Sequence, residues 1–199
     1  MALNAALGLR VAGVAGTFTV NKGITVNAGP GDNAVVLAGI TTGGGALPQG
    51  GNLNINGGKS DDVIGLFGLQ IGGNLTVNGS DGNNAILVQG GTVSGNLTFN
   101  GLGGTDTFLL ENVSFSIHSI AIAHLGAGDD RVRFFATDIQ MMGSLTLTID
   151  GGAGTDLRLT TNIPTGAVVK NFEGDWNSAD AMGDQAGIIA ILIGLLIPA

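Results

Sequence analysis

Aspartates recur at one position of a repeated turn in the second half of the chain. Asp106, Asp130 and Asp156 each close a glycine-rich stretch, and Asp129 lies beside Asp130. If these turns stack, their carboxylates lie about 4.8 Å apart, and like charges at that distance bind a cation, take up protons or splay into water. Two interpretations stay open: the residues cap their turns with solvent-facing carboxylates, or all four bind calcium together with turn carbonyls.

Arginines follow the same aspartates. Arg131 and Arg133 alternate on a predicted strand directly after Asp129 and Asp130. Carboxylates and arginines on one strand are also what a polysaccharide lyase or hydrolase would place on the face of a β-helix. The chain has only two glutamates, however, and no pair of acid and base carboxylates is apparent on neighbouring coils. We therefore predict no catalytic residues and no enzyme, and keep the lyase or hydrolase as the third hypothesis.

These turns belong to a repeat with a period of 22 residues. Three consecutive units, 51–72, 73–94 and 95–116, begin with Gly-Asn-Leu, and looser copies follow over 117–142 and 143–166. Frequent glycines exclude helical repeats, and apolar and polar residues alternate in three short runs per unit. A fixed period of this size is typical of stacked units. We predict an all-β fold, a parallel β-helix (β-solenoid) of about six coils of about 22–28 residues, with three strands per coil and apolar terminal segments.

Stacking of the units predicts vertical columns of like side chains. Asparagines form one turn column, a second turn column mixes asparagine and aspartate, and outward threonines at 25, 76, 98 and 146 would form a third column that suggests ice binding as an alternative. The predicted core and turn columns are Leu53/Leu75/Leu97, Ile55/Val77/Phe99, Ile64/Ile86/Phe108, Leu66/Val88/Leu110, Ile71/Val93/Phe115, Asn27/Asn56/Asn78/Asn100 and Asn33/Asp62/Asn84/Asp106/Asp130/Asp156.

The turns carry a family resemblance. GLGGTD (101–106), LGAGDD (125–130) and GGAGTD (151–156) resemble the GGxGxD calcium-binding turns of RTX proteins, although they recur at 22 to 29 residues instead of at nine. The stretch 23–166 is similar to extracellular β-strand-repeat, adhesin-like parallel β-helix proteins. The resemblance implies an extracellular or cell-surface location, and calcium as the candidate cofactor.

Composition excludes several classes of protein. The chain of 199 residues has 37 glycines, yet 44% of its residues are hydrophobic, so it can bury a core. Its net charge of -8 offers no basic face for nucleic acid. It has no cysteine, which excludes disulfides and thiolate metal sites. The apolar segment 187–199 is shorter than the roughly 17–25 residues of a spanning helix, so we predict no membrane span.

Three regions follow from these patterns. Residues 1–22 are predicted to be an N-terminal cap or connector, 23–174 the β-solenoid, and 175–199 a polar break followed by an apolar C-terminal tail. Both ends of a solenoid expose strand edges, so they must be capped or polymerise. The tail is expected to cover its own subunit or to reach a neighbour.

An apolar stripe on the outside of the second strands is the expected docking surface for the tail. We therefore predict a non-catalytic structural protein that self-assembles, as a homo-oligomer or filament, through its termini and this stripe into an extracellular filament or surface layer. The alternative is an adhesive or carbohydrate-binding passenger module stabilised by calcium. The residues predicted at the assembly interface are Val36, Phe67, Leu87, Leu109, Phe135, Ile188, Ile189, Ile191, Leu192, Leu195 and Leu196.

Overall fold

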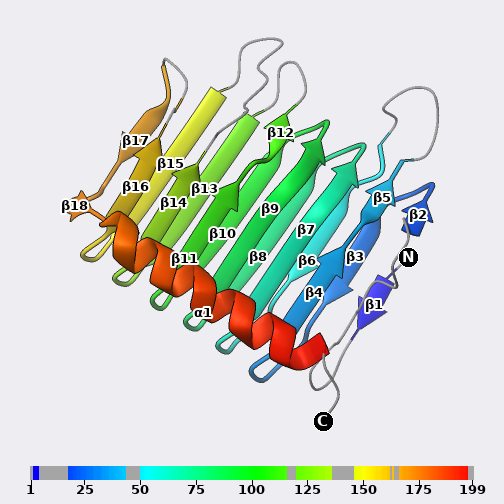
Figure 1. Cartoon of the computed structure of the whole chain (residues 1–199), viewed down its shortest axis with the longest axis horizontal. Helices are drawn as coiled ribbons and strands as arrows, with labels where there is room; N and C mark the ends of the chain where they lie inside the picture. Colours follow the sequence, from blue (N-terminus) through cyan, green and yellow to red (C-terminus); the bar gives the residue numbers. More distant parts are fainter. Residues whose placement is uncertain are drawn as a thin grey trace.

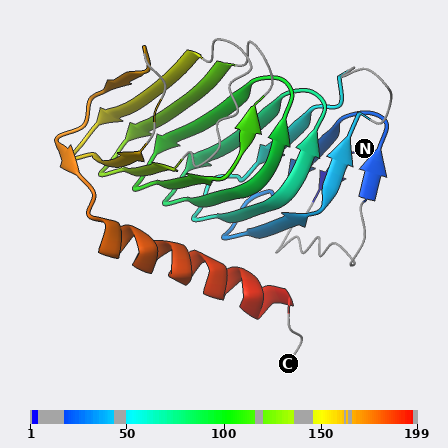
Figure 2. The ribbon, with the colours of Figure 1, turned by 45° about the horizontal axis from the view of Figure 1, so that its top comes forward.

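The computed structural model is a stack of parallel strands with one helix along its side (Figures 1 and 2). It describes residues 2–4, 18–43, 50–115, 120–135, 146–161, 163 and 166–196. Every strand pairing among these residues is parallel, and each joins one coil to the next. The predicted fold class, a parallel β-solenoid, is therefore confirmed.

Two sheets form the walls of the solenoid. The first sheet runs in the order β1 (Ala2–Asn4), β3 (Ile24–Asn27), β6 (Leu53–Asn56), β8 (Leu75–Asp81), β10 (Leu97–Gly103), β13 (Ile120–Ala127), β15 (Thr146–Ala153) and β17 (Val168–Lys170). The second runs in the order β18 (Gly174–Asp175), β16 (Leu157–Thr161), β14 (Arg131–Phe135), β11 (Thr107–Glu111), β9 (Ala85–Val93), β7 (Val63–Ile71), β5 (Ile40–Thr42) and β2 (Phe18–Val20), with β12 (Ser114–Phe115) on β9 and β4 (Ala34–Ala38) on β7.

The coils differ from the prediction in two details. From β3 to β15 the first sheet has six strands, so the chain completes five turns between them, slightly fewer than the six coils expected. In β7 and β9 the second and third predicted strands run together as one strand of nine residues. Gly68 and Gly90 lie at the bends of these strands with φ of 57° and 66°. Glycine adopts this left-handed conformation without steric cost, which lets one strand serve two faces.

The predicted core columns are confirmed by the strand register. Leu53 pairs with Leu75 and Leu75 with Leu97, and the other four columns align in the same way. The described members of these columns are buried. Phe99 and Phe108 belong to two different columns, and their rings stack with centroids 4.4 Å apart. Apolar side chains stacked at one strand spacing remove nearly all their surface from water, which is the main stabilising term for such a chain.

The register differs from the prediction beyond residue 117. In the outward column, Thr98 pairs with Ile122, and Ile122 pairs with Thr148. Thr146 is therefore not part of the threonine column. A shift of two residues keeps the same side chains outward, so the alternation alone does not detect it. The column is therefore interrupted by an isoleucine, and the ice-binding interpretation loses its regular array.

The segment predicted to be an N-terminal cap or connector contains two strands. Strands β1 and β2 lie within 1–22 and extend the two sheets, because β1 pairs with β3 and β2 with β5. At the other end, helix α1 (Ser178–Leu196) begins inside the segment expected to be a polar break. Among the described residues, this helix is not long and apolar enough to cross a membrane.

Candidate functional site

Helix α1 covers the predicted apolar stripe. It crosses the outer face of the second sheet, from the last coils toward the first (Figures 1 and 2). Ile188 and Leu192 are buried against the sheet, together with the outward residues of β4, β9 and β11. The tail thus folds back on its own subunit. The buried residues of this cluster are Val36, Leu87, Leu109, Trp176, Ala181, Ile188 and Leu192.

The residues predicted at the assembly interface divide into three groups. Val36, Leu87, Leu109, Ile188 and Leu192 are buried between sheet and helix, so within one chain the stripe is not an open docking surface. The others differ in exposure. Phe67 and Ile189 are partly buried against the same cluster, Ile191 is 51% exposed, and the side chains of Phe135, Leu195 and Leu196 lie outside the described part of the structure.

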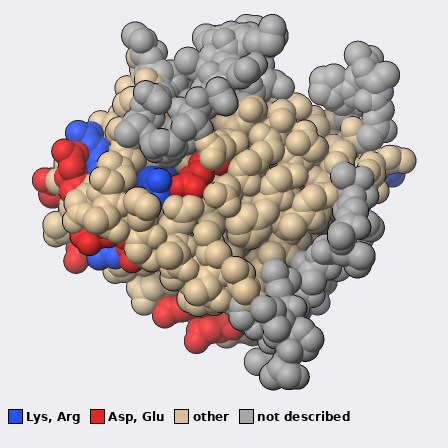
Figure 3. Space-filling model, viewed as in Figure 1, with Lys and Arg blue, Asp and Glu red and all other residues tan. Residues whose placement is uncertain are grey.

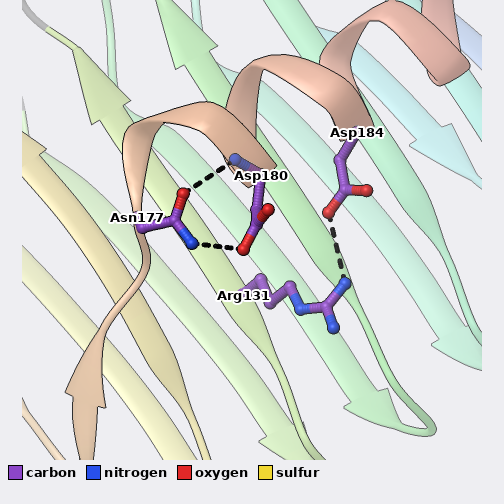
Figure 4. Close-up of polar contacts among 4 residues, drawn as sticks. All are labelled: Arg131, Asn177, Asp180 and Asp184. Carbon is purple, nitrogen blue, oxygen red and sulfur yellow. Dashed lines mark hydrogen bonds and ion pairs between the residues drawn. The ribbon is translucent and has the colours of Figure 1, made fainter.

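The start of α1 is fixed by a capping arrangement (Figure 4). The Asn177 side chain accepts a hydrogen bond from the Asp180 backbone N–H at 2.9 Å, and its amide Nδ2 donates to the Asp180 carboxylate. The first bond satisfies a backbone N–H that has no partner inside the helix, and the second holds the two side chains together. The spacing N-x-x-D in the sequence is the signal that would have placed the helix start here.

Arg131 of β14 links the sheet to the first turns of α1 (Figure 4). Its guanidinium lies 3.2 Å from the Asp184 carboxylate and 5.9 Å from the centroid of the Trp176 ring. A shallow depression of about 360 Å³ lies between Arg131, Trp176, Asp180 and Asp184. Because Trp176 is only 3% exposed, it offers no open stacking face, and these contacts hold the helix.

A buried polar network makes a second anchor. Arg133 forms an ion pair with Glu111 at 3.0 Å, and both side chains are largely buried. Gln185 of α1 joins this pair, since it accepts from Arg133 at 2.8 Å and donates to Glu111 at 2.7 Å. Gln89 also donates to Glu111, at 3.3 Å. Sequence reasoning missed Glu111 and Gln185, which are 74 residues apart and carry no motif.

The predicted acid and arginine cluster is dispersed in the fold. Asp130 is fully buried, whereas its neighbour Asp129 is exposed and accepts a hydrogen bond from the Thr155 backbone N–H. Arg131 and Arg133 point to the helix instead. The four groups therefore do not converge on one surface, and this arrangement gives the lyase or hydrolase hypothesis no support.

The mixed asparagine and aspartate column forms a continuous ladder along the inside of the turns. In each coil the backbone N–H of the column residue donates to the side-chain Oδ1 of the next coil, over 2.7 to 3.1 Å. The ladder ends where Asp156 N–H donates to Glu173 at 2.7 Å. These bonds satisfy turn N–H groups that sheet pairing leaves over.

The aspartates of this ladder are buried, which corrects the expectation of solvent-facing carboxylates. Asp106, Asp130 and Asp156 are 0% exposed and Asp62 is 1% exposed. Desolvation by burial is the largest effect on all four and raises their pKa values, that of Asp106 to about 7 and that of Asp130 to about 6. Hydrogen bonds from the ladder act against this rise without cancelling it.

The predicted calcium ligands do not form a shared site. Asp106, Asp130 and Asp156 lie inside the turn column, and Asp129 lies outside it. Among the residues that the structure describes, no group of three or more histidine, aspartate or glutamate side chains is placed to hold a metal ion. Calcium needs six to eight oxygen ligands, so the geometry gives this prediction no support.

A polar column also runs along the outer face of the first sheet. Asn56, Asn78 and Asn100 each donate their side-chain amide to the asparagine of the preceding coil, at 2.7 to 2.8 Å. The predicted asparagine column is therefore confirmed, and His124 and Asp150 continue it in the last coils.

Comparison with known proteins gives no relative on which a function could be based. No protein family, curated protein or solved structure matches the chain. Its function must therefore be argued from the solenoid, the covering helix and the two ends.

Proposed function

We propose that the protein is a non-catalytic structural subunit that stacks end to end into an extracellular filament or surface layer. The observation that carries the proposal is the state of the sheet edges. The last strands of the two sheets, β17 and β18, each pair with one neighbour among the described residues, and so do β1 and β2 at the other end. Such an edge is a template for a further parallel strand.

The position of α1 directs assembly to the ends. Because the helix covers the apolar stripe of its own subunit, the stripe is unavailable to a neighbour unless the helix leaves. Apolar side chains near the C-terminal end remain accessible instead: Val168 in β17 is 48% exposed and Ile163 is 37% exposed. A contact from one end to the other that does not close on itself produces a filament.

Charged side chains are unevenly distributed over the surface (Figure 3). On the face in Figure 3, most charged side chains lie on the side of the last coils and along the lower edge, and most of the other described surface is uncharged. The net charge of -8 adds like-charge repulsion between subunits, which salt screens. The resemblance of 23–166 to extracellular repeat proteins supports a location outside the cell.

Negative-stain electron microscopy and sedimentation velocity of the purified full-length chain test the proposal. Val168→Lys places a charge on the C-terminal edge strand and should abolish filaments, since edge lysines prevent strand addition. Leu102→Lys is the matched control, because Leu102 is 60% exposed in β10, away from the two ends, and its substitution should leave filaments intact. A wild-type chain that stays monomeric over a wide concentration range would contradict the proposal.

The second candidate is an adhesive or carbohydrate-binding module. The observation that favours it is the flat row of bonded asparagines on the first sheet, whose amides are held in one orientation. Fixed amides recognise sugar hydroxyls at little entropic cost. Glycan-array binding that is lost in Asn78→Ala, together with a monomeric wild type, would favour this candidate over the filament.

A further inference from the structure

The turn ladder contains two kinds of residue at equivalent positions. Asn33 and Asn84 occupy the column in two coils, and aspartates occupy it in the others. Both asparagines donate from their side-chain amide within their own turn. Nδ2 of Asn84 donates to the carbonyl of Gly82 at 3.0 Å and to that of Ser80 at 3.5 Å, and Asn33 donates in the same way to residues two and four positions earlier.

In Asp62, Asp106 and Asp156 the second carboxylate oxygen takes the place of that amide nitrogen. The glycine five residues earlier in the chain serves as a common reference point for this comparison. A Cβ added to Gly79 would lie 2.9 Å from Nδ2 of Asn84. A Cβ on Gly101 would lie 2.3 Å from Oδ2 of Asp106. Gly57 with Asp62 and Gly151 with Asp156 repeat the relationship, at 2.4 and 2.6 Å. By this equivalence, Oδ2 faces the carbonyls of its own turn, as Nδ2 does.

Asparagine and ionised aspartate differ at this atom, because the amide donates a hydrogen bond and the carboxylate does not. Within the described part of the chain, Oδ2 of Asp62, Asp106, Asp130 and Asp156 is buried and has no hydrogen-bond partner. An ionised Oδ2 would bring its lone pairs against carbonyl lone pairs in a dry site, which is costly. A protonated Oδ2 carries one O–H donor, and this restores the bond that asparagine makes.

We propose that Asp62, Asp106, Asp130 and Asp156 are built into the solenoid as neutral carboxylic acids, each donating its Oδ2 proton to a backbone carbonyl of its own turn. The ladder then binds protons on folding. Its Oδ1 atoms keep accepting from the neighbouring coil, so one side chain bonds both along the stack and within its turn.

The charged groups that act on the column favour the neutral form. Asp32 and Asp61 act on Asp62, and Asp130 and Asp61 act on Asp106. These groups are carboxyls, and so are those that act on the last two coils. In those coils the groups are Asp129 and Asp156 on Asp130, and Asp129, Asp150 and Glu173 on Asp156.

Proton uptake on folding makes stability depend on pH with a defined sign. The pKa values of these aspartates are raised from 3.8 in the unfolded chain, to about 7 at Asp106 and about 6 at Asp130. Between pH 4 and 7 the folded state binds more protons than the unfolded state, so stability falls as the pH rises across this window and levels off above it. The ladder is therefore strongest in acidic surroundings.

Thermal melting of the full chain from pH 4 to pH 8 tests the proposal, with Asp106→Asn and Asp106→Asn/Asp130→Asn as variants. Asparagine carries a permanent donor at the same place, so these variants should lose most of the decline in Tm. At pH 8 they should melt higher than wild type by roughly 5 °C or more, and at pH 4 they should melt close to it. Asp81→Asn is the matched control, because Asp81 is exposed, and it should keep the wild-type profile.

A second measurement does not depend on stability. Carboxyl ¹³C NMR of aspartate-labelled protein should give resonances of neutral acid at pH 5.5. Those of Asp106 and Asp130 should disappear in the Asp106→Asn/Asp130→Asn variant, and those of Asp62 and Asp156 should remain. Ionised resonances at pH 5.5 for all four aspartates would overturn the proposal. So would an Asp106→Asn variant that is less stable than wild type at pH 8, since that result requires a working carboxylate at this position.

Discussion

Leu192 of α1 lies directly against the backbone of Gly65 in β7. A Cβ added to Gly65 would be 2.4 Å from the Leu192 Cδ1 atom and 2.8 Å from the Phe67 ring. Gly65 stands in the outward column between Val36 and Leu87, so its missing side chain forms a notch in the apolar stripe. The helix thus fits this sheet through a specific large-to-small contact.

Gly65→Val is expected to destabilise the protein by about 1–3 kcal/mol, because the added side chain overpacks the contact with Leu192. Urea unfolding followed by the fluorescence of Trp176, the single tryptophan of the chain, measures this loss and reports directly on the helix interface. Gly65→Val combined with Leu192→Ala frees the space and should recover part of the stability. A Gly65→Val protein as stable as wild type would contradict the tight contact.

Glu111→Gln is expected to destabilise the protein by about 3 kcal/mol, because it leaves the largely buried Arg133 guanidinium without its counter-charge. Chemical denaturation measures the effect. The control is Arg158→Gln, which removes an exposed ion pair with Asp175 and should cause no measurable change. Equal effects of the two substitutions would show that the buried network does not anchor the helix.

Asn177→Ala removes the N-cap of α1 and should cost about 1 kcal/mol. The helix signal in circular dichroism should melt earlier, and the fluorescence of Trp176 should shift at lower temperature than in wild type. Asn177→Ser keeps a capping oxygen and should behave like wild type. If Ala and Ser give the same melting curve, the bonds between Asn177 and Asp180 do not stabilise the helix.

The 22-residue period was sufficient to predict most of the solenoid. Between 51 and 116 the units have equal length, so Leu75 and Leu97 or Asn78 and Asn100 align without ambiguity, and the register confirms both pairs. Beyond 117 the units lengthen, and Thr146 and Thr148 fit the outward pattern equally well. Alternation has a period of two, so it does not distinguish a shift of two residues.

The turn aspartates and the helix were harder to predict for different reasons. Asp106 is charged in its ordinary state, so the sequence favours a solvent-facing side chain, and only the burial of the whole column reverses that expectation. The exchange of Asn84 for Asp106 at one repeat position was the available signal, because it points to a hydrogen-bonding task that either side chain can perform. Helix α1 is apolar on nearly all sides after Asp184. Its sequence therefore has no amphipathic pattern that would predict which face is buried.

Glycines of the chain should respond in opposite directions to alanine. Gly101→Ala would place a Cβ 2.0 Å from the Leu125 carbonyl oxygen and 2.3 Å from Oδ2 of Asp106, and backbone on one side prevents easy relief. We expect a loss of about 2 kcal/mol or more in free energy of unfolding.

Gly183→Ala is the matched comparison, since Gly183 lies in α1 with no atom within 4 Å of the added Cβ. It should gain about 0.5–1 kcal/mol through helix propensity. Differential scanning calorimetry of the two variants against wild type measures both changes. If Gly101→Ala leaves the stability unchanged, Asp106 and the neighbouring coil do not lie as close to Gly101 as the ladder requires. If Gly183→Ala lowers the stability, the position of Gly183 on the helix is in contact with another part of the protein.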